Sequence, residues 1–192
     1  MTDAARTDRR PRADAARNRA AILEAARTAL TSGGDDPSLE AIARAAGVGI
    51  GTLYRNFATR EELLAAVYAS ELEAVLATME PLLASRPADE ALREFMRNYS
   101  GFIATKRGLA ESVRAGALRS AAASADTRRR VNEVVDAALV AGADQGVLQP
   151  GLQADDVTAG MIGVFLTTAQ SEDPEQAERL LDLLVRGLRT GE

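Results

Sequence analysis

The chain has no cysteine, no histidine and no tryptophan among its 192 residues, and aromatic residues make up only 4% of it. Without cysteine it can form no disulfide. Without cysteine and histidine it lacks the usual ligands of a zinc site, a histidine-dependent catalytic triad and a cysteine nucleophile. We therefore expect no metal site, no cofactor and no catalytic residue.

Long apolar runs are missing as well. No run approaches the roughly 20 residues that span a bilayer, and the first twenty residues carry charges throughout, in place of the apolar core of a signal peptide. These features predict a cytoplasmic protein with no membrane partner. Alanine, leucine and valine abound, whereas glycine and proline lie mostly at segment joints, which favours an all-α protein.

Residues 38–63, SLEAIARAAGVGIGTLYRNFATREEL, are the most informative stretch. Ser38 can cap a short helix, and Gly47 can end it because glycine adopts the left-handed conformation without steric cost. A second short helix follows from about Ile50 to Phe57. Two short helices joined at a glycine, the second with a polar outer face, predict a helix-turn-helix that binds DNA.

The outer face of the second helix has the chemistry of a DNA contact. Its start carries little side-chain bulk, so it can approach base edges, and the N–H groups at a helix start attract phosphate. Thr52 suits a base edge or a thymine methyl, whereas Tyr54 and Arg55 can reach phosphates or, for Arg55, a guanine. The predicted DNA-binding residues are Ser38, Gly49, Ile50, Gly51, Thr52, Tyr54, Arg55 and Arg60. The alternative is a helical hairpin that only closes a bundle, which has no need of the Gly-X-Gly start.

The net charge of −5 is distributed unevenly. Residues 1–60 hold ten arginines and seven acidic residues, a balance of +3, whereas residues 61–192 hold thirteen basic and twenty-one acidic residues, a balance of −8. The positive part contains the helix-turn-helix, so the acidic total does not argue against DNA. Residues 1–13 are expected to form a disordered basic arm, which either follows the DNA backbone or enters a minor groove, or is a solvated leader.

From Ile22 to Val67 the chain resembles the N-terminal domain of the TetR family of transcriptional regulators. The matching segments are ILEAA at 22–26, the glycine pair at 33–34, SLEAIARAAGV at 38–48, GTLYRNF at 51–57 and REELL at 60–64. The resemblance implies a three-helix DNA-binding head, a long connecting helix, and a helical body that dimerises and usually binds a small effector.

The resemblance also implies roles for single residues. Thr52, Tyr54 and Arg55 correspond to contacts of the recognition helix, and Arg60 corresponds to a basic phosphate contact. The chain departs from the family at Gly49, where a serine or threonine commonly caps the recognition helix, and at Leu30, where an aromatic residue is frequent.

Breaker residues and apolar periodicity predict about nine helices. Besides the two of the motif, they are expected over residues 14–31, 59–81, 88–105, a shorter segment after Gly108, 127–142, 154–170 and 174–189. Thr59 and Glu62 are spaced as a capping box at the start of the long helix. The predicted domains are a basic arm at 1–13, a helix-turn-helix domain at 14–58 and a ligand-binding and dimerisation domain at 59–192.

The last two helices are candidates for a homodimer interface. Glycines in the first of them lower helix propensity and indicate close approach by another helix. Two such helices from each subunit can pair as a four-helix bundle, and the alternative is packing within one chain. The predicted interface residues are Val157, Gly160, Met161, Val164, Leu180, Leu181, Leu184 and Leu188.

A small-molecule site is predicted from apolar and polarizable residues of the body. Methionine and aromatic side chains suit an adaptable pocket, although they suit a protein core equally well. The candidates are Met79, Met96, Tyr99, Phe102 and Phe165, with Arg114 as a partner for an anion. The sequence does not identify the effector.

These features predict a repressor. A homodimer binds a near-palindromic operator in double-stranded DNA, and an effector in the body favours a state in which the long helix holds the two heads at the wrong separation. One alternative is a DNA binder without an effector, controlled by a protein partner or acting as an activator. The other is an enzyme with Asp155 and Asp156 in its chemistry, but these residues fit helix-cap charges better.

Overall fold

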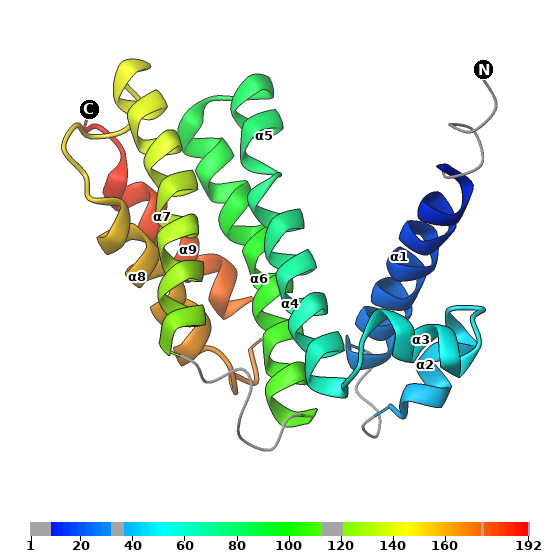
Figure 1. Cartoon of the computed structure of the whole chain (residues 1–192). Helices are drawn as coiled ribbons and strands as arrows, with labels where there is room; N and C mark the ends of the chain where they lie inside the picture. The colour runs from blue at the N-terminus through cyan, green and yellow to red at the C-terminus, as the bar shows by residue number, and fades with distance from the viewer. Residues whose placement is uncertain (1–8, 32–36, 113–120, 174, 192) are drawn as a thin grey trace, which may run out of the picture. The chain divides into compact units, whose positions relative to one another are not determined.

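The structure, a computed structural model, describes residues 9–31, 37–112, 121–173 and 175–191 (Figure 1). The elements of this part are helical, which confirms the predicted all-α class. They are α1 (Arg9–Thr31), α2 (Leu39–Ala45), α3 (Ile50–Asn56), α4 (Arg60–Leu76), α5 (Met79–Ser85), α6 (Ala88–Ser112), α7 (Ala121–Asp144), α8 (Ala154–Thr167) and α9 (Gln176–Leu188).

The chain forms two compact units. In its described part, unit 1 contains α1, α2, α3, the first part of α4 up to Glu71, and the end of α6 from Thr105. Unit 2 contains the end of α4, α5, α6 up to Ala104, and α7, α8 and α9. The division of the chain at residue 58, predicted from the sequence, stays a prediction.

Unit 1 is built on one apolar face of α1. Ile22, Ala26 and Leu30 recur every fourth residue, which places them on one side of the helix, and all three are buried. The helices α2, α3 and α4 complete this core with Ile42, Ala43, Leu53, Phe57, Leu63, Leu64 and Val67. The core therefore fixes the two motif helices on α1.

The turn between α2 and α3 has the predicted geometry. Ser38 caps α2, because its Oγ accepts a hydrogen bond from the Ala41 N–H at 3.1 Å. Gly47 has a φ of +69°, the left-handed conformation that glycine adopts without strain. At the start of α4, the Glu62 N–H donates to Thr59 Oγ1 at 3.1 Å, as predicted, while the Glu62 carboxylate accepts from the Ala58 N–H at 2.8 Å.

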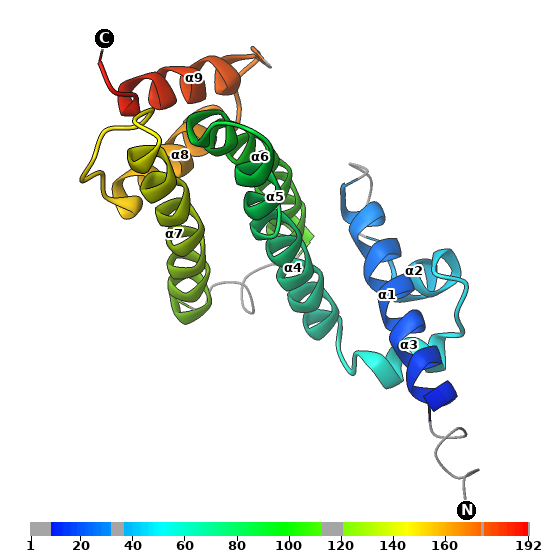
Figure 2. The same cartoon turned by 90° about the horizontal axis from the view of Figure 1, so that it is seen from above.

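In unit 2, α7 packs on α8 and α8 packs on α9 (Figure 2). The helix α6 is tied to α9 by Arg93, whose Nε donates to Asp182 at 2.5 Å and whose Nη2 donates to the Glu178 carboxylate at 2.7 Å. The loop after α7 pairs with the end of the chain, since the Gln149 N–H donates to the Leu188 carbonyl at 2.9 Å. These bonds join α6, and the loop after α7, to α9.

Several helix boundaries differ from the sequence prediction. The helix α1 begins at Arg9 and so takes in residues assigned to the basic arm, of which residues 1–8 lie outside the described part. The expected helix 59–81 is divided, because α4 ends at Leu76 and α5 begins at Met79. Gly108 does not interrupt α6, and α7 begins at Ala121.

Within the ranges given above, none of the helices combines the length and the apolar character that a transmembrane span requires.

Candidate nucleic-acid interface

The helix α3, the second helix of the motif, presents an inner and an outer face. Leu53 on its inner face is fully buried, and Phe57, which directly follows the helix, is 2% exposed. On the outer face Ile50 is 38% and Tyr54 48% exposed. The outer face of α3 therefore presents an aliphatic and a phenolic side chain to the outside of unit 1.

The start of α3 is open. Gly49 is the residue before the helix, and its carbonyl accepts from the Thr52 and Leu53 N–H groups at 2.8 and 3.2 Å. A Cβ built on Gly49 or Gly51 would meet no atom within 4 Å, and neither glycine has a positive φ. Neither packing nor backbone conformation within the chain therefore requires glycine at these two positions.

The polar residues of α3 bond to one another. Arg55 Nη2 donates to Thr52 Oγ1 at 2.9 Å, and Asn56 Nδ2 donates to the Thr52 carbonyl at 2.8 Å. Because Thr52 Oγ1 already accepts one bond, its own hydroxyl proton remains to be donated. Thr52 and Arg55 together therefore offer hydrogen-bond donors, which suit the acceptor atoms of guanine or of phosphate.

Ser38 and Arg60 lie at the joint between α2 and α4. Ser38 caps α2, as described above. Arg60 is half-buried, and its Nη1 donates to the Pro37 carbonyl at 2.6 Å. Both side chains thus hold the local fold, and their predicted contact with DNA stays a prediction.

Arg19 of α1 contacts the recognition helix, which the sequence reasoning missed. Its Nη1 donates to the Asn56 carbonyl at 3.2 Å, and its guanidinium carbon lies 4.3 Å from the centre of the Phe57 ring. The available signal was its position three residues before Ile22, on the same side of α1 as the apolar stripe.

The predicted effector residues gather in unit 2. Met79, Met96, Tyr99, Phe102 and Phe165 are all at most 5% exposed. The Tyr99 ring centre lies 5.1 Å from that of Phe102 and 6.3 Å from that of Phe165. These five side chains form part of the core of unit 2, and Arg114 lies outside the described residues.

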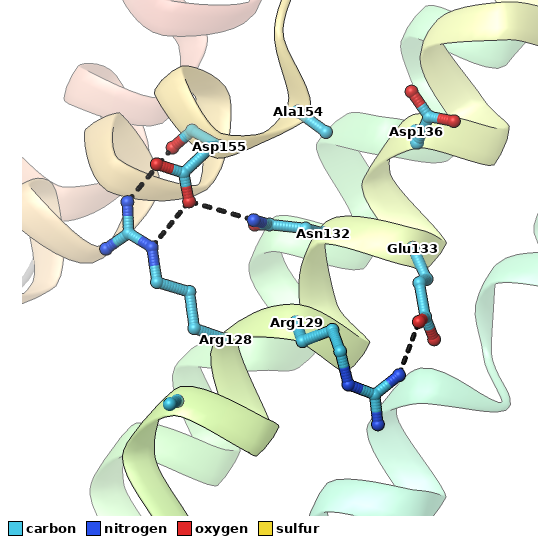
Figure 3. Close-up of a pocket in the computed structure, with 8 residues that line it drawn as sticks. Arg128, Arg129, Asn132, Glu133, Asp136, Ala154 and Asp155 are labelled. Carbon is cyan, nitrogen blue, oxygen red and sulfur yellow. Dashed lines mark hydrogen bonds and ion pairs between the residues drawn. The ribbon is translucent and has the colours of Figure 1, made fainter. Parts of the chain in front are cut away.

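A polar depression of about 530 Å³ lies between α7 and the start of α8 (Figure 3). Arg128 Nε and Asn132 Nδ2 both donate to Asp155 Oδ1, at 2.6 and 2.8 Å, and together they lower the pKa of Asp155 to about 2. Arg129 pairs with Glu133 beside them. Both arginines already form ion pairs with carboxylates of the same chain. We therefore interpret these polar residues as a structural contact between α7 and α8, and not as a ligand site.

The predicted dimer residues divide into two sets. Val157, Met161, Leu181 and Leu188 are at most 8% exposed and are core residues of the chain itself. The other four, Gly160, Val164, Leu180 and Leu184, are half-buried. A Cβ on Gly160 would lie 3.2 Å from Leu184 Cδ1, so the close helix approach indicated by this glycine occurs between α8 and α9 of one chain.

The exposed surface of α8 and α9 has further apolar residues. Leu166 is 67% and Leu183 is 61% exposed. Leu183 also lines a depression of about 410 Å³ on α9, with Leu180, Arg179 and Arg186. The sequence analysis did not single out Leu166 and Leu183. For Leu183 a signal was available, because it lies on the side of α9 that carries Arg179, away from the stripe of Leu181, Leu184 and Leu188.

Comparison with known families covers most of the chain. Residues 22–67 match the family described as bacterial regulatory proteins, tetR family. Residues 87–190 match the family described as transcriptional regulator SbtR-like, C-terminal domain. No curated protein matches the chain.

Solved structures show the same similarity. A TetR transcriptional regulator from Streptomyces coelicolor has 38% identity and a TM-score of 0.76, over 91% of this chain and 99% of that one. A TetR regulatory protein from Mycobacterium vanbaalenii has 28% identity and a TM-score of 0.72, over 93% and 99% of the two chains. A TetR-family regulator from Thermus thermophilus has 25% identity and a TM-score of 0.58, over 88% and 99%.

Proposed function

The chain belongs to the TetR family of bacterial transcriptional regulators, and from this premise we propose that it is a homodimeric repressor released from DNA by a small molecule. In this proposal α3 of each subunit enters the major groove of one half of a near-palindromic operator. The matched family and the similar structures are described as transcriptional regulators, which supports a role in DNA binding.

The observation that carries the DNA-binding proposal is the pair of glycines at the start of α3. A helical glycine costs about 1 kcal/mol relative to alanine, and the surroundings of Gly51 leave room for a Cβ. The absence of a side chain therefore serves no packing within the chain. Close approach of α3 to a base edge or a phosphate of DNA would explain why these positions have no side chain.

The outer face supplies contacts of different kinds. Ile50 offers an apolar surface to a thymine methyl, Thr52 and Arg55 offer donors to a purine edge, and Tyr54 reaches the sugar-phosphate backbone. Tyr54→Ala should therefore weaken binding on all DNA sequences, whereas Thr52→Ala should change the preference among operators. Fluorescence anisotropy with a selected operator and its single-base variants measures both effects. Equal affinity of both variants and the wild type would contradict the assignment of this face.

Selection of binding sites from random double-stranded DNA tests the proposal as a whole. We expect enrichment of a near-palindrome whose half-sites are centred about 34–36 Å apart, or a multiple of one helical turn. Failure to enrich any sequence at low ionic strength, without added metabolites, would refute the proposed function. The position of the selected site in a genome also identifies the regulated gene.

A dimer is required by the small size of α3. One helix of seven residues contacts few base pairs, and a two-fold axis doubles the site that is read. The proposed dimer surface consists of the outward residues of α8 and α9. Leu166 and Leu183 are its most exposed members, and Val164, Leu180 and Leu184 flank them.

The effector is proposed to bind in unit 2 beside the aromatic cluster of Tyr99, Phe102 and Phe165. An apolar molecule with an aromatic ring fits the chemistry of these residues. The effector need only prefer the released state by about 1–3 kcal/mol to control binding. Thermal shifts against a panel of metabolites test this proposal, and a panel that leaves the melting temperature unchanged favours a partner-controlled regulator or an activator.

A further inference from the structure

The C-terminal end of α3 needs partners from outside the helix. The last carbonyl groups of a helix have no intrahelical donors, and that end carries partial negative charge. The Phe57 N–H closes the last turn by donating to the Leu53 carbonyl at 2.9 Å. The carbonyl of Asn56, the last residue of α3, is not part of this bond. In a helix of seven residues, a loose last turn leaves the whole helix poorly fixed.

Arg19 meets this need from α1. Its Nη1 donates to the Asn56 carbonyl at 3.2 Å, so a charged donor reaches the negative end of the helix. Its guanidinium also lies over the Phe57 ring, 4.3 Å from the centroid, in a cation–π contact. Phe57 is buried in the core of unit 1, so the two contacts join the end of α3 to both α1 and that core.

From Asn56 the contacts continue to the residues that face outward. The Asn56 amide donates to the Thr52 carbonyl at 2.8 Å, and Arg55 donates to Thr52 Oγ1 at 2.9 Å. Thr52 lies four residues before Asn56, about one turn away. A shift of the Asn56 end therefore moves Thr52 and Arg55 together.

We propose that Arg19 is a positioning residue that sets the tilt and rotation of the recognition helix on α1. It acts through Asn56 and Phe57 and does not itself read a base. The part of this inference that concerns DNA rests on the proposed function. The part that concerns the order of α3 is a property of the free protein.

The competing role for an exposed arginine on a DNA-binding unit is a phosphate contact, and the two roles differ in what they change. Loss of a phosphate contact weakens binding on every sequence and reduces the slope of log affinity against log salt by about 0.9. Loss of a positioning contact reduces the preference for the operator over unrelated DNA and leaves that slope unchanged.

The test compares Arg19→Gln with Arg17→Gln in the full chain. Arg17 lies two residues away on α1, is exposed, and pairs with Asp14. Both variants remove one positive charge from the same helix, so a general loss of attraction to DNA affects them equally. Arg19→Lys is the conservative variant, since it keeps the charge but loses the planar guanidinium.

Two measurements are made on each variant. Amide hydrogen exchange over residues 50–57 in the free protein reports the order of α3. Affinities for the selected operator and for unrelated DNA, at several salt concentrations, report positioning against phosphate contact.

For Arg19→Gln we expect exchange in α3 about tenfold faster, and a preference for the operator about tenfold smaller, from the loss of a charge-assisted bond and a cation–π contact. Arg17→Gln should match the wild type in both respects, and Arg19→Lys should lie between. If exchange in Arg19→Gln equals that of Arg17→Gln, the inference is overturned, and it is overturned in favour of a phosphate contact if only the salt slope falls. A wild type that binds no DNA refutes the proposed function, while the exchange measurement still decides the role of Arg19.

Discussion

At Gly51, adding one methyl group should change the stability of α3 and its proposed access to DNA in opposite directions. A Cβ at this position meets no atom of the chain within 4 Å, so Gly51→Ala should raise the free energy of unfolding by up to about 1 kcal/mol through helix propensity. In the proposed complex with DNA, the same methyl group would stand between the helix and a base edge. Losing one base contact should weaken operator binding roughly ten- to a hundredfold.

Urea denaturation and operator anisotropy measure the two effects of Gly51→Ala. Gly101→Ala is the matched control, because Gly101 is an exposed glycine of α6 whose Cβ would also meet no atom within 4 Å. It should gain stability without a change in affinity. Unchanged operator binding by Gly51→Ala would remove the reason given for a glycine at the start of α3.

Gly142 is small for the opposite reason, because the chain itself fills the space beside it. A Cβ there would lie 2.4 Å from Leu148 Cδ1 and 2.9 Å from Leu148 Cβ, and Leu148 is fully buried. Gly142→Ala should therefore lower the free energy of unfolding by about 1–3 kcal/mol, as overpacking does. Urea denaturation checks this, again with Gly101→Ala as the control. A stability equal to that of the wild type would mean that the loop carrying Leu148 moves away without cost.

The sequence was sufficient for those elements whose ends carry their own chemical signal. Ser38, Gly47 and the Thr59–Glu62 pair mark helix ends by capping bonds or by a left-handed residue, and the structure has these contacts. The same local rules predicted which residues of α3 face outward. A boundary set by local hydrogen bonds can be found without knowledge of the rest of the fold.

The helix boundaries that the sequence analysis missed depend on a balance between competing energies, and not on one local hydrogen bond. Pro81 has no N–H to donate to Ala77, so it would destabilise a continuous helix by about 3 kcal/mol, but it is tolerated in the first turn of α5. At Gly108 a cost of about 1 kcal/mol is smaller than that of leaving backbone groups unpaired at a break, and α6 continues. The position of Arg19 beside the apolar stripe of α1 indicates that it faces the core of unit 1, but no sequence pattern identifies its partner Asn56, 37 residues away.

The joint between α7 and α8 should respond to pH. The pKa of Asp155 is lowered from 3.8 to about 2, first by its bond with Arg128 and then by that with Asn132. Because the folded chain favours the carboxylate, the stabilisation is fully present above the ordinary pKa of 3.8 and is lost as the pH falls through about 2.

Asp155→Asn tests this joint by urea denaturation at a series of pH values. The variant should be less stable than the wild type near neutral pH, and the difference should shrink as the pH falls from about 4 towards 2. Arg128→Gln should behave in the same way, and the double variant should lose little more than either single variant. A difference between Asp155→Asn and the wild type that is constant with pH would contradict the pair.

At the scale of the whole molecule, the charge distribution and the two family matches divide the chain into the same N-terminal and C-terminal parts. The first 60 residues carry the positive balance and the recognition helix, whereas the acidic remainder includes the C-terminal family match at residues 87–190. The helix α4 begins in unit 1 and ends in unit 2, so the chain itself joins the part proposed to bind DNA to the part proposed to bind an effector. The proposed dimer would join two such chains.

The proposed dimer surface on α8 and α9 can be tested by placing a charge on its most exposed part. Leu183→Asp changes a side chain that is 61% exposed, so the fold of the subunit should be kept. Burying a carboxylate between two subunits is unfavourable, and in a two-fold contact it is introduced twice. Sedimentation at micromolar concentration should show a dimer for the wild type and a monomer for the variant.

Val140→Asp is the matched control for the dimer test, since Val140 on α7 is 55% exposed and lies outside α8 and α9. It should sediment like the wild type. The operator affinity of Leu183→Asp should also fall, commonly by a factor of about 10² or more. In a dimer the second recognition helix is held close to the DNA once the first is bound, and a monomer loses this effective concentration. If Leu183→Asp remained a dimer with full operator affinity, the subunits would have to meet through another surface, and Leu166 and Leu183 would be exposed for a different reason.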